Sequence, residues 1–149
     1  MNSNTDRWLL SSIAKHFSAI AQGNIEFLLE DEQRNTEGLN EWVELRVNGP
    51  EYKEFDKDCY MVSVEVDLLI TVRMTKTNIY RIHELCGLFE STCDNIPIYK
   101  FGNGGSFVFC LPLDPNMVSN IRKLYYGKVE ATQLQRASVS AFYETLTVL

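Results

Sequence analysis

Alternating apolar and polar residues predict one long β-strand near the middle of the chain. From Val62 to Thr75 every second residue is apolar, which is the period of a strand with one buried face. Typical strands have about five or six residues, so this strand is expected to extend past a compact core. The charged stretch Glu51 to Asp58 is expected to be the exposed tip of a long hairpin. That hairpin joins the strand to an earlier one, Glu41 to Val47, which should end at the turn Asn48-Gly49-Pro50.

Two other segments have the apolar spacing of three and four residues that is typical of amphipathic helices. Their apolar positions are Leu9, Ile13, Phe17 and Ile20 in the first helix, and Ile79, Ile82, Cys86, Phe89 and Cys93 in the second. Asn4 or Thr5 is expected to cap the first helix, and Gly23 to end it. Thr77 or Asn78 is expected to cap the second, which should pack on the apolar face of the sheet.

The remaining segments complete an α+β pattern. Three further strands and a closing strand are expected at Ile25–Glu30, Ile98–Phe101, Phe107–Leu111 and Ala137–Val148. The sequence Gly102-Asn103-Gly104-Gly105 has the composition of a hairpin turn. Between Asp114 and Tyr126 the pattern is weak, and a short helical segment with Asp114 as cap and Pro115 in its first turn fits it. We therefore expect a single domain, 1–149, with a mostly antiparallel twisted sheet, a long β-hairpin whose tip at about 50–60 projects, and two amphipathic helices packed against the sheet.

The charge of the chain is unevenly distributed. The formal net charge is −6, which argues against a protein that binds nucleic acid by neutralising phosphates. Between Glu26 and Asp67 there are 13 acidic residues against 4 basic ones, a local net of −9, whereas Leu68 to Leu149 holds 8 basic and 6 acidic residues, a net of +2. The molecule is therefore expected to be polarised.

The cysteines and histidines do not predict a metal or cofactor site. The four cysteines form no C-x-x-C pair, and only His16 and His83 could complete a zinc site. We expect buried, reduced thiols and no bound cofactor. Cys86 and Cys93 lie about 10 Å apart along the predicted helix, too far for a disulfide. No apolar stretch reaches the roughly 20 residues of a membrane-spanning helix, and the apolar run from Trp8 to Ala21 is interrupted by charge, so neither membrane nor export is expected.

No catalytic constellation emerges from the sequence, and we expect no enzyme. The glycine turn at 102–105 lacks the Lys-Ser/Thr of a phosphate-binding loop, and His83 has no marked nucleophile or orienting acid beside it. Neither Glu30-Asp31-Glu32 nor Asp56-Lys57-Asp58 has the spacing of a calcium loop. Glu65 and Asp67 project from the same face of the long strand, where a solvated surface is the favoured interpretation over an acidic wall that repels a negative partner.

Four aromatic residues are candidates for contacts with other subunits or proteins. Tyr52 and Phe55 stand among charged residues at the expected hairpin tip. Trp42 and Tyr143 each belong to a pair of neighbouring large side chains on a strand, of which one must point to either face. Burial in the core is the favoured interpretation for these last two, since aromatic side chains bury a large area.

The order of elements resembles that of tail terminator and related head-tail completion proteins of tailed bacteriophages. The residues that carry the likeness are Glu41 to Val47 with the Gly49-Pro50 turn, Val64 to Ile70, the helix Ile79 to Cys93, and the end Ala137 to Val148. The resemblance implies a homo-oligomeric ring, usually a hexamer, in the tail or neck of the virion, assembled in the host cytoplasm. Such a ring caps the tail tube protein, ends its polymerisation and joins it to the head-tail connector protein, while DNA passes through its lumen without specific binding.

Two hypotheses follow from this resemblance and the charge distribution. Glu65 and Asp67, or the acidic loop Glu30, Asp31 and Glu32, face the lumen and keep DNA from adhering. The tip from Tyr52 to Cys59 contacts the tail tube or the neighbouring copy. The rival interpretation is a small cytosolic ligand-binding or regulatory α+β module with a pocket between the second helix and the sheet.

Overall fold

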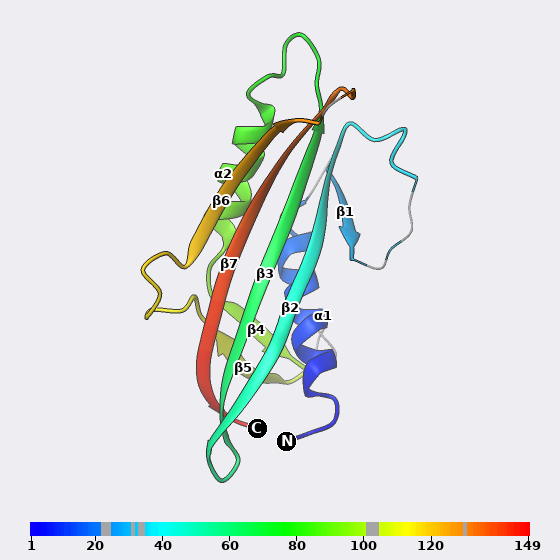
Figure 1. The fold of residues 1–149 in the computed structure, drawn as a ribbon. Coiled ribbons are helices and arrows are strands. Elements are labelled where there is room, and N and C mark those ends of the chain that lie inside the picture. The colour runs from blue at the N-terminus through cyan, green and yellow to red at the C-terminus, as the bar shows by residue number, and fades with distance from the viewer. Residues whose placement is uncertain (22–24, 31, 33–34, 101–104, 130) are drawn as a thin grey trace.

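The computed structural model describes residues 1–149 except 22–24, 31, 33–34, 101–104 and 130 (Figure 1). The described elements are α1 (Thr5–Ser18), β1 (Glu26–Leu29), β2 (Glu41–Asp56), β3 (Cys59–Arg73), α2 (Arg81–Thr92), β4 (Ile96–Tyr99), β5 (Phe107–Leu111), β6 (Ile121–Lys128) and β7 (Leu134–Val148). Neither of these helices has the length and hydropathy needed to cross a bilayer. The glycine stop at Gly23, the loop residue Asp31 and the turn residues 102–104 lie outside the described residues.

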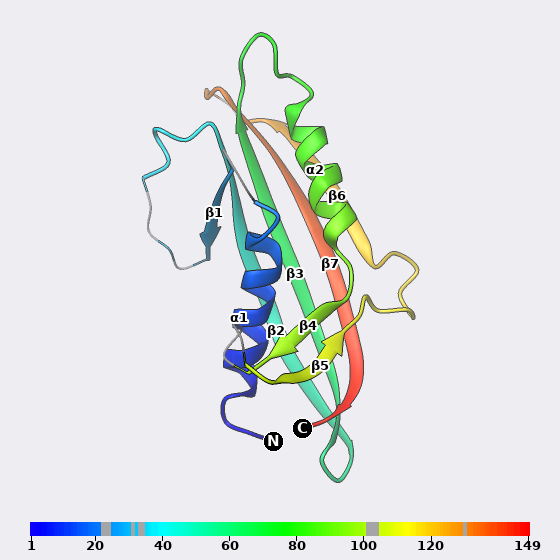
Figure 2. The ribbon, with the colours of Figure 1, turned by 180° about the vertical axis from the view of Figure 1, so that it is seen from behind.

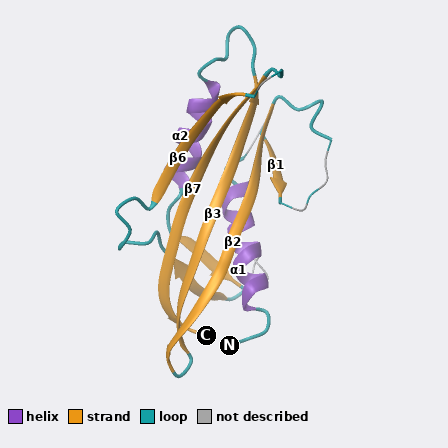
Figure 3. Cartoon of the chain, in the orientation of Figure 1, coloured by secondary structure: helices purple, strands orange, loops and turns teal. Residues whose placement is uncertain are grey.

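Five strands form one twisted sheet in the order β1-β2-β3-β7-β6, and β4 pairs with β5 in a second, two-stranded sheet (Figure 3). The short β1 runs parallel to β2, and all other pairs are antiparallel. Both helices and the β4–β5 pair lie against the same face of the large sheet (Figure 2). The predicted α+β class, with a mostly antiparallel sheet and two packed helices, is confirmed.

The core lies between that face and the helices. In β3 the side chains of Val62, Val64, Val66, Leu68, Ile70 and Val72 are at most 4% exposed, as the alternation predicts. They pack with Leu9, Ile13 and Phe17 of α1 and Ile82, Leu85 and Phe89 of α2 in one cluster. Since burying such side chains stabilises a fold by roughly 1.5–3 kcal/mol each, this layer holds the domain together.

The long hairpin differs from its prediction in where its strands end. β2 does not stop at Val47 but continues to Asp56, and it pairs with β3 over most of that length. The Gly49-Pro50 pair forms an irregularity within the strand: the register shifts between Asn48 and Glu51, and Gly49 takes a φ of +103° that suits glycine. The turn is reduced to Lys57 and Asp58, so only the last part of the expected 50–60 tip lies outside paired strands.

The stretch expected to be a short helix is instead partly a strand. Residues Ile121–Lys128 form β6 and pair with β7 through contacts such as Lys123 opposite Val139. Asp114 does not cap a helix; its carboxylate accepts a hydrogen bond from the backbone of Asn116 at 2.8 Å in a turn. Pairing with the edge of β7 satisfies the backbone of this segment, which explains why its weak helical spacing is overridden.

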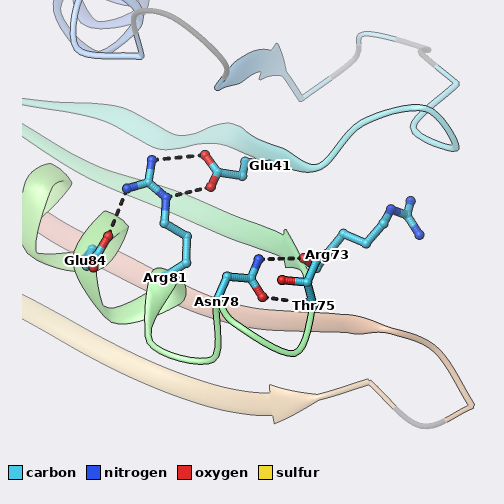
Figure 4. Close-up of polar contacts among 6 residues, drawn as sticks. All are labelled: Glu41, Arg73, Thr75, Asn78, Arg81 and Glu84. Carbon is cyan, nitrogen blue, oxygen red and sulfur yellow. Dashed lines mark hydrogen bonds and ion pairs between the residues drawn. The ribbon is translucent and has the colours of Figure 1, made fainter.

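The second helix also begins later than predicted. Neither Thr77 nor Asn78 caps it, because the helix starts at Arg81 after Tyr80. The Asn78 side chain instead donates to the carbonyl of Arg73 at 3.0 Å and accepts from the backbone of Thr75, which closes the loop after β3 (Figure 4). Ile79, expected in the apolar stripe, is consequently 46% exposed.

Candidate interaction surfaces

The face of the large sheet opposite the helices is the broadest surface that the fold presents, and we call it the open face. By register, this face includes Trp42, Glu44, Arg46, Asn48 and Glu51 of β2, Ser63, Glu65, Asp67, Leu69 and Thr71 of β3, Arg122, Leu124 and Tyr126 of β6, and Arg136, Ser138, Ser140, Phe142 and Glu144 of β7. No helix or strand among the described residues packs over this face (Figures 1 and 2). It mixes both signs of charge with hydroxyl, amide and aromatic side chains.

Glu65 and Asp67 both lie on the open face, as their spacing predicts, but in different surroundings. The Asp67 carboxylate accepts hydrogen bonds from Asn48 Nδ2 at 2.8 Å and Ser140 Oγ at 2.6 Å. Arg46 stands directly opposite Asp67 on β2. Glu65 stands between Asn48 and Phe142 in the register. Asp67 therefore joins three strands, whereas Glu65 is the acid whose charge is more available to a partner.

The rest of the open face is not uniformly acidic. Glu144 accepts a hydrogen bond from Ser63 Oγ at 2.9 Å. The Arg122 guanidinium lies over the Phe142 ring, 5.5 Å from its centroid, which is a cation–π distance. The surface thus has the alternating signs that suit specific docking of another protein surface.

Glu30 and Glu32 lie on the other side of the sheet, beside α1. Both line a hollow of about 930 Å³ between α1 and the β2 edge, together with apolar groups such as Leu10 and Val47. The chain turns just after β1, where the backbone of Glu32 donates to the carbonyl of Leu29 at 2.9 Å. The two acidic sets proposed for one lumen are therefore not brought together by the fold.

At the hairpin, Phe55 and Tyr52 have different roles. Phe55 is 58% exposed, with Lys53 Nζ 5.4 Å from its ring centroid, so it is available for contact. Tyr52 faces the helices, and its hydroxyl donates a hydrogen bond to Asp6 Oδ1 at 2.6 Å. Burial, and then the Asp6 carboxylate, raise the pKa of Tyr52 well above its usual range. Tyr52 thus ties the hairpin to α1.

Trp42 and Tyr143 are not available as contact residues, because they are only 2% and 1% exposed. Tyr143 lies in the core, where burial first and the nearby Cys93 raise its pKa. Trp42 lies on the open face by register, beside its partner Thr71, and both side chains are buried there. Both side chains are therefore buried within the chain itself, and Tyr143 lies in the core, as the favoured interpretation expects.

The histidine and cysteine side chains of the described residues are the candidates for a metal site. No group of three or more His, Cys, Asp and Glu side chains among them could hold a metal ion. His16 Nε2 lies 2.9 Å from the carbonyl of Thr92, and the His83 ring lies 4.8 Å from that of Tyr125. The thiols of Cys86 and Cys93 are buried, as expected, while Cys110 is exposed and Cys59 half-buried.

Arg81 connects the start of the second helix to the sheet. Arg81 donates to both carboxylate oxygens of Glu41, at 2.6 and 3.2 Å, and to Glu84 at 3.0 Å (Figure 4). The hydrogen bond to Glu41 is the main reason that the pKa of Arg81 is raised. A bidentate pair of this kind fixes orientation. This ion pair holds the start of α2 next to β2.

Among known proteins, similarity to this chain is found in the fold. No family model and no curated protein matches the sequence. Ten chains of solved structures match the fold. One of them, whose name states no function, superposes with a TM-score of 0.62 over 97% of this chain and 96% of its own, at 8% sequence identity. The chain therefore shares its whole architecture with a protein of known structure and almost none of its sequence.

Proposed function

We propose that the chain is a structural virion protein of a tailed bacteriophage. It forms a ring, of six copies by the resemblance, on the end of the tail tube. The ring ends polymerisation of the tube protein and joins the tail to the head-tail connector. The supporting observation is the open face: a broad polar and charged sheet surface that no described element covers, next to an exposed hairpin tip. Such surfaces serve protein contacts, and they differ from the concave pocket of an enzyme.

In this proposal Glu65 and Asp67 line the channel through which DNA passes. Their carboxylates lie on the open face, and like charge disfavours adhesion of the phosphate backbone. Of the two candidate sets, this one is preferred over Glu30 and Glu32, which line the hollow beside α1. Replacing both residues by lysine should slow DNA passage while particles still assemble. Ejection of DNA at the normal rate from particles with both substitutions would contradict the assignment of Glu65 and Asp67 to the channel.

The direct test mixes the purified protein with tail tubes and examines them by negative-stain microscopy. The expected result is a ring-shaped density at one end of each tube and tubes that no longer lengthen. Phe55→Ser at the tip should weaken this capping. Phe107→Ser is the matched control, because Phe107 is 59% exposed but belongs to β5 and not to the β2–β3 hairpin. Equal capping by both variants, or tubes left open by the native protein, would contradict the proposal.

One observation favours a second candidate, a ligand-binding or regulatory module. The hollow beside α1 has a volume of about 930 Å³ and includes Leu10, Ala14 and Leu29. It is not in the place expected from the sequence, because the space between α2 and the sheet is filled by Ile82 and Phe89, both 0% exposed. A strict monomer that binds a small apolar probe in this hollow and ignores tail tubes would favour the module.

A further inference from the structure

The large sheet has two unfilled edges, one on each side. β1 has only four residues and covers β2 from Trp42 to Leu45. Beyond that point, from Arg46 to Asp56, no described strand pairs with the outer side of β2. On the far side of the sheet, β6 pairs with β7 alone. Each edge therefore presents a row of backbone groups that a further strand could pair with.

These edges carry opposite charge. The free stretch of β2, from Arg46 to Asp56, contains three acidic residues (Glu51, Glu54, Asp56) and two basic ones (Arg46, Lys53), a formal net of −1. The strand β6 contains three basic residues (Arg122, Lys123, Lys128) and no acidic one, a net of +3. Two copies of β6 side by side would repel, whereas the basic residues of β6 are attracted to the acidic residues Glu51, Glu54 and Asp56 of the free stretch.

Exposed apolar groups follow the same two edges. On β6, Leu124, Tyr125 and Tyr126 are between 45% and 59% exposed. Beside the β2 edge, Leu10 and Leu29 are 39% and 47% exposed at the rim of the hollow next to α1. A long edge strand offers backbone groups for a further strand, and the exposed apolar side chains beside both edges add area that such pairing would bury.

We propose that the β6 edge of one copy pairs with the β2 edge of the next copy, so that the sheets of neighbouring copies become continuous. This contact is heterologous, because it joins different surfaces, and such contacts close into rings when the rotation between copies allows it. The proposal deepens the proposed function by naming the surfaces through which copies meet. Its occupant is a second copy of this chain, chosen by the charge complementarity of the edges.

The lengths of the two edges are compatible with this pairing. The eight residues of β6 span about 26 Å at roughly 3.3 Å per residue. The free stretch of β2, from Arg46 to Asp56, is longer and includes the irregularity at Gly49-Pro50. The β6 strand therefore fits on the free stretch without displacing β1.

Charge reversal on each edge separately tests the pairing. The β6 variant is Arg122→Glu with Lys128→Glu; Lys123 stays because it pairs with Glu90 at 2.7 Å. The β2 variant is Glu51→Lys with Glu54→Lys, both at exposed positions. Each variant alone should self-associate at least about tenfold more weakly than the native chain in sedimentation velocity. Lys76→Glu, in the exposed loop after β3, is the control and should associate normally.

Mixing decides whether the contact is heterologous. The two variants together should assemble, because the native β2 edge of one meets the native β6 edge of the other and the reversed edges also attract. A chain that carries all four substitutions should recover assembly by itself. A native chain that stays monomeric with and without tail tubes would overturn the pairing, as would variants whose association is unchanged or is not recovered on mixing. If the chain forms rings whose assembly depends on these charges but the rings do not cap tail tubes, the edge pairing is supported and the tube-capping function is contradicted.

Discussion

The two faces of the same sheet are built by different forces. On the covered face, the side chains of β3 are at most 4% exposed and pack against both helices. On the open face, the intervening residues of β3 from Ser63 to Leu69 are partly exposed, and those with partners use hydrogen bonds, such as Asp67 with Asn48 and Ser140. The covered face therefore supplies most of the stability, because hydrophobic burial dominates folding. The open face contributes less to the stability of the fold, so its side chains are available for contacts with a partner.

The largest expected effect comes from truncating neighbouring leucines on β3. Leu68 is 1% exposed in the core, while Leu69 lies on the open face and is half-buried. Leu68→Ala should lower the free energy of unfolding by about 2–5 kcal/mol, because it leaves a cavity, and Leu69→Ala by about 1 kcal/mol. Urea denaturation of the two purified variants measures both. Similar losses would show that the faces do not differ as described.

The next largest effect is expected from the buried thiol of Cys93, which should make the stability of the fold depend on pH. Burial is the main cause that raises the pKa of Cys93 to about 11. Since the unfolded thiol ionises near its ordinary value, the folded state loses stability as pH rises from about 9 to 11, by on the order of 2 kcal/mol. Urea midpoints measured at pH 8 to 11 should show this loss.

Two comparisons isolate the Cys93 contribution. Cys93→Ala should flatten the alkaline loss, although not abolish it, because the raised pKa values of Tyr52 and Tyr143 act in the same direction. At neutral pH the exposed Cys110 should react with a thiol reagent well before Cys93. An unchanged pH profile in Cys93→Ala would count against the buried-thiol account.

A substitution at the bulge in β2 should lower the stability of the fold by an intermediate amount. At Gly49 the φ of +103° is strained for other residues, and an added Cβ would lie 3.2 Å from both Glu51 N and Ser63 O. Gly49→Ala should therefore cost about 1–2 kcal/mol of stability. Gly38→Ala is the matched control, since nothing lies within 4 Å of its added Cβ. Thermal unfolding compares the two, and an equal change in both would leave the bulge without a special role.

The elements that were predictable are those whose periodicity reflects burial. The alternation in β3 and the spacing in α1 follow directly from their one covered face. The strand β6 was missed because most of its side chains are exposed, so no periodic pattern remains in its sequence. The end of β2 was misplaced because Gly49-Pro50 suits a turn and a bulge equally well.

The surfaces were less predictable than the fold, because they depend on register between distant strands. Spacing alone places Glu65 and Asp67 on one face. Only the pairing of β2, β3 and β7 brings Asn48 and Ser140 to Asp67. The opposite charge of the two sheet edges likewise needs the strand order, which puts β6 and β2 on opposite sides.

The smallest expected effect separates the two acids of the open face. Asp67 accepts two hydrogen bonds from neighbouring strands, whereas no side chain among the described residues donates a hydrogen bond to Glu65. Asp67→Ala should therefore lower the free energy of unfolding by about 1 kcal/mol and Glu65→Ala by less than about 0.5 kcal/mol. Ser140→Ala should remove part of the Asp67 effect in a double-mutant cycle, because the two side chains share one contact. If Glu65 proved as costly as Asp67, the open face would hold together by more than these contacts, and Glu65 would no longer be the acid left free for a partner.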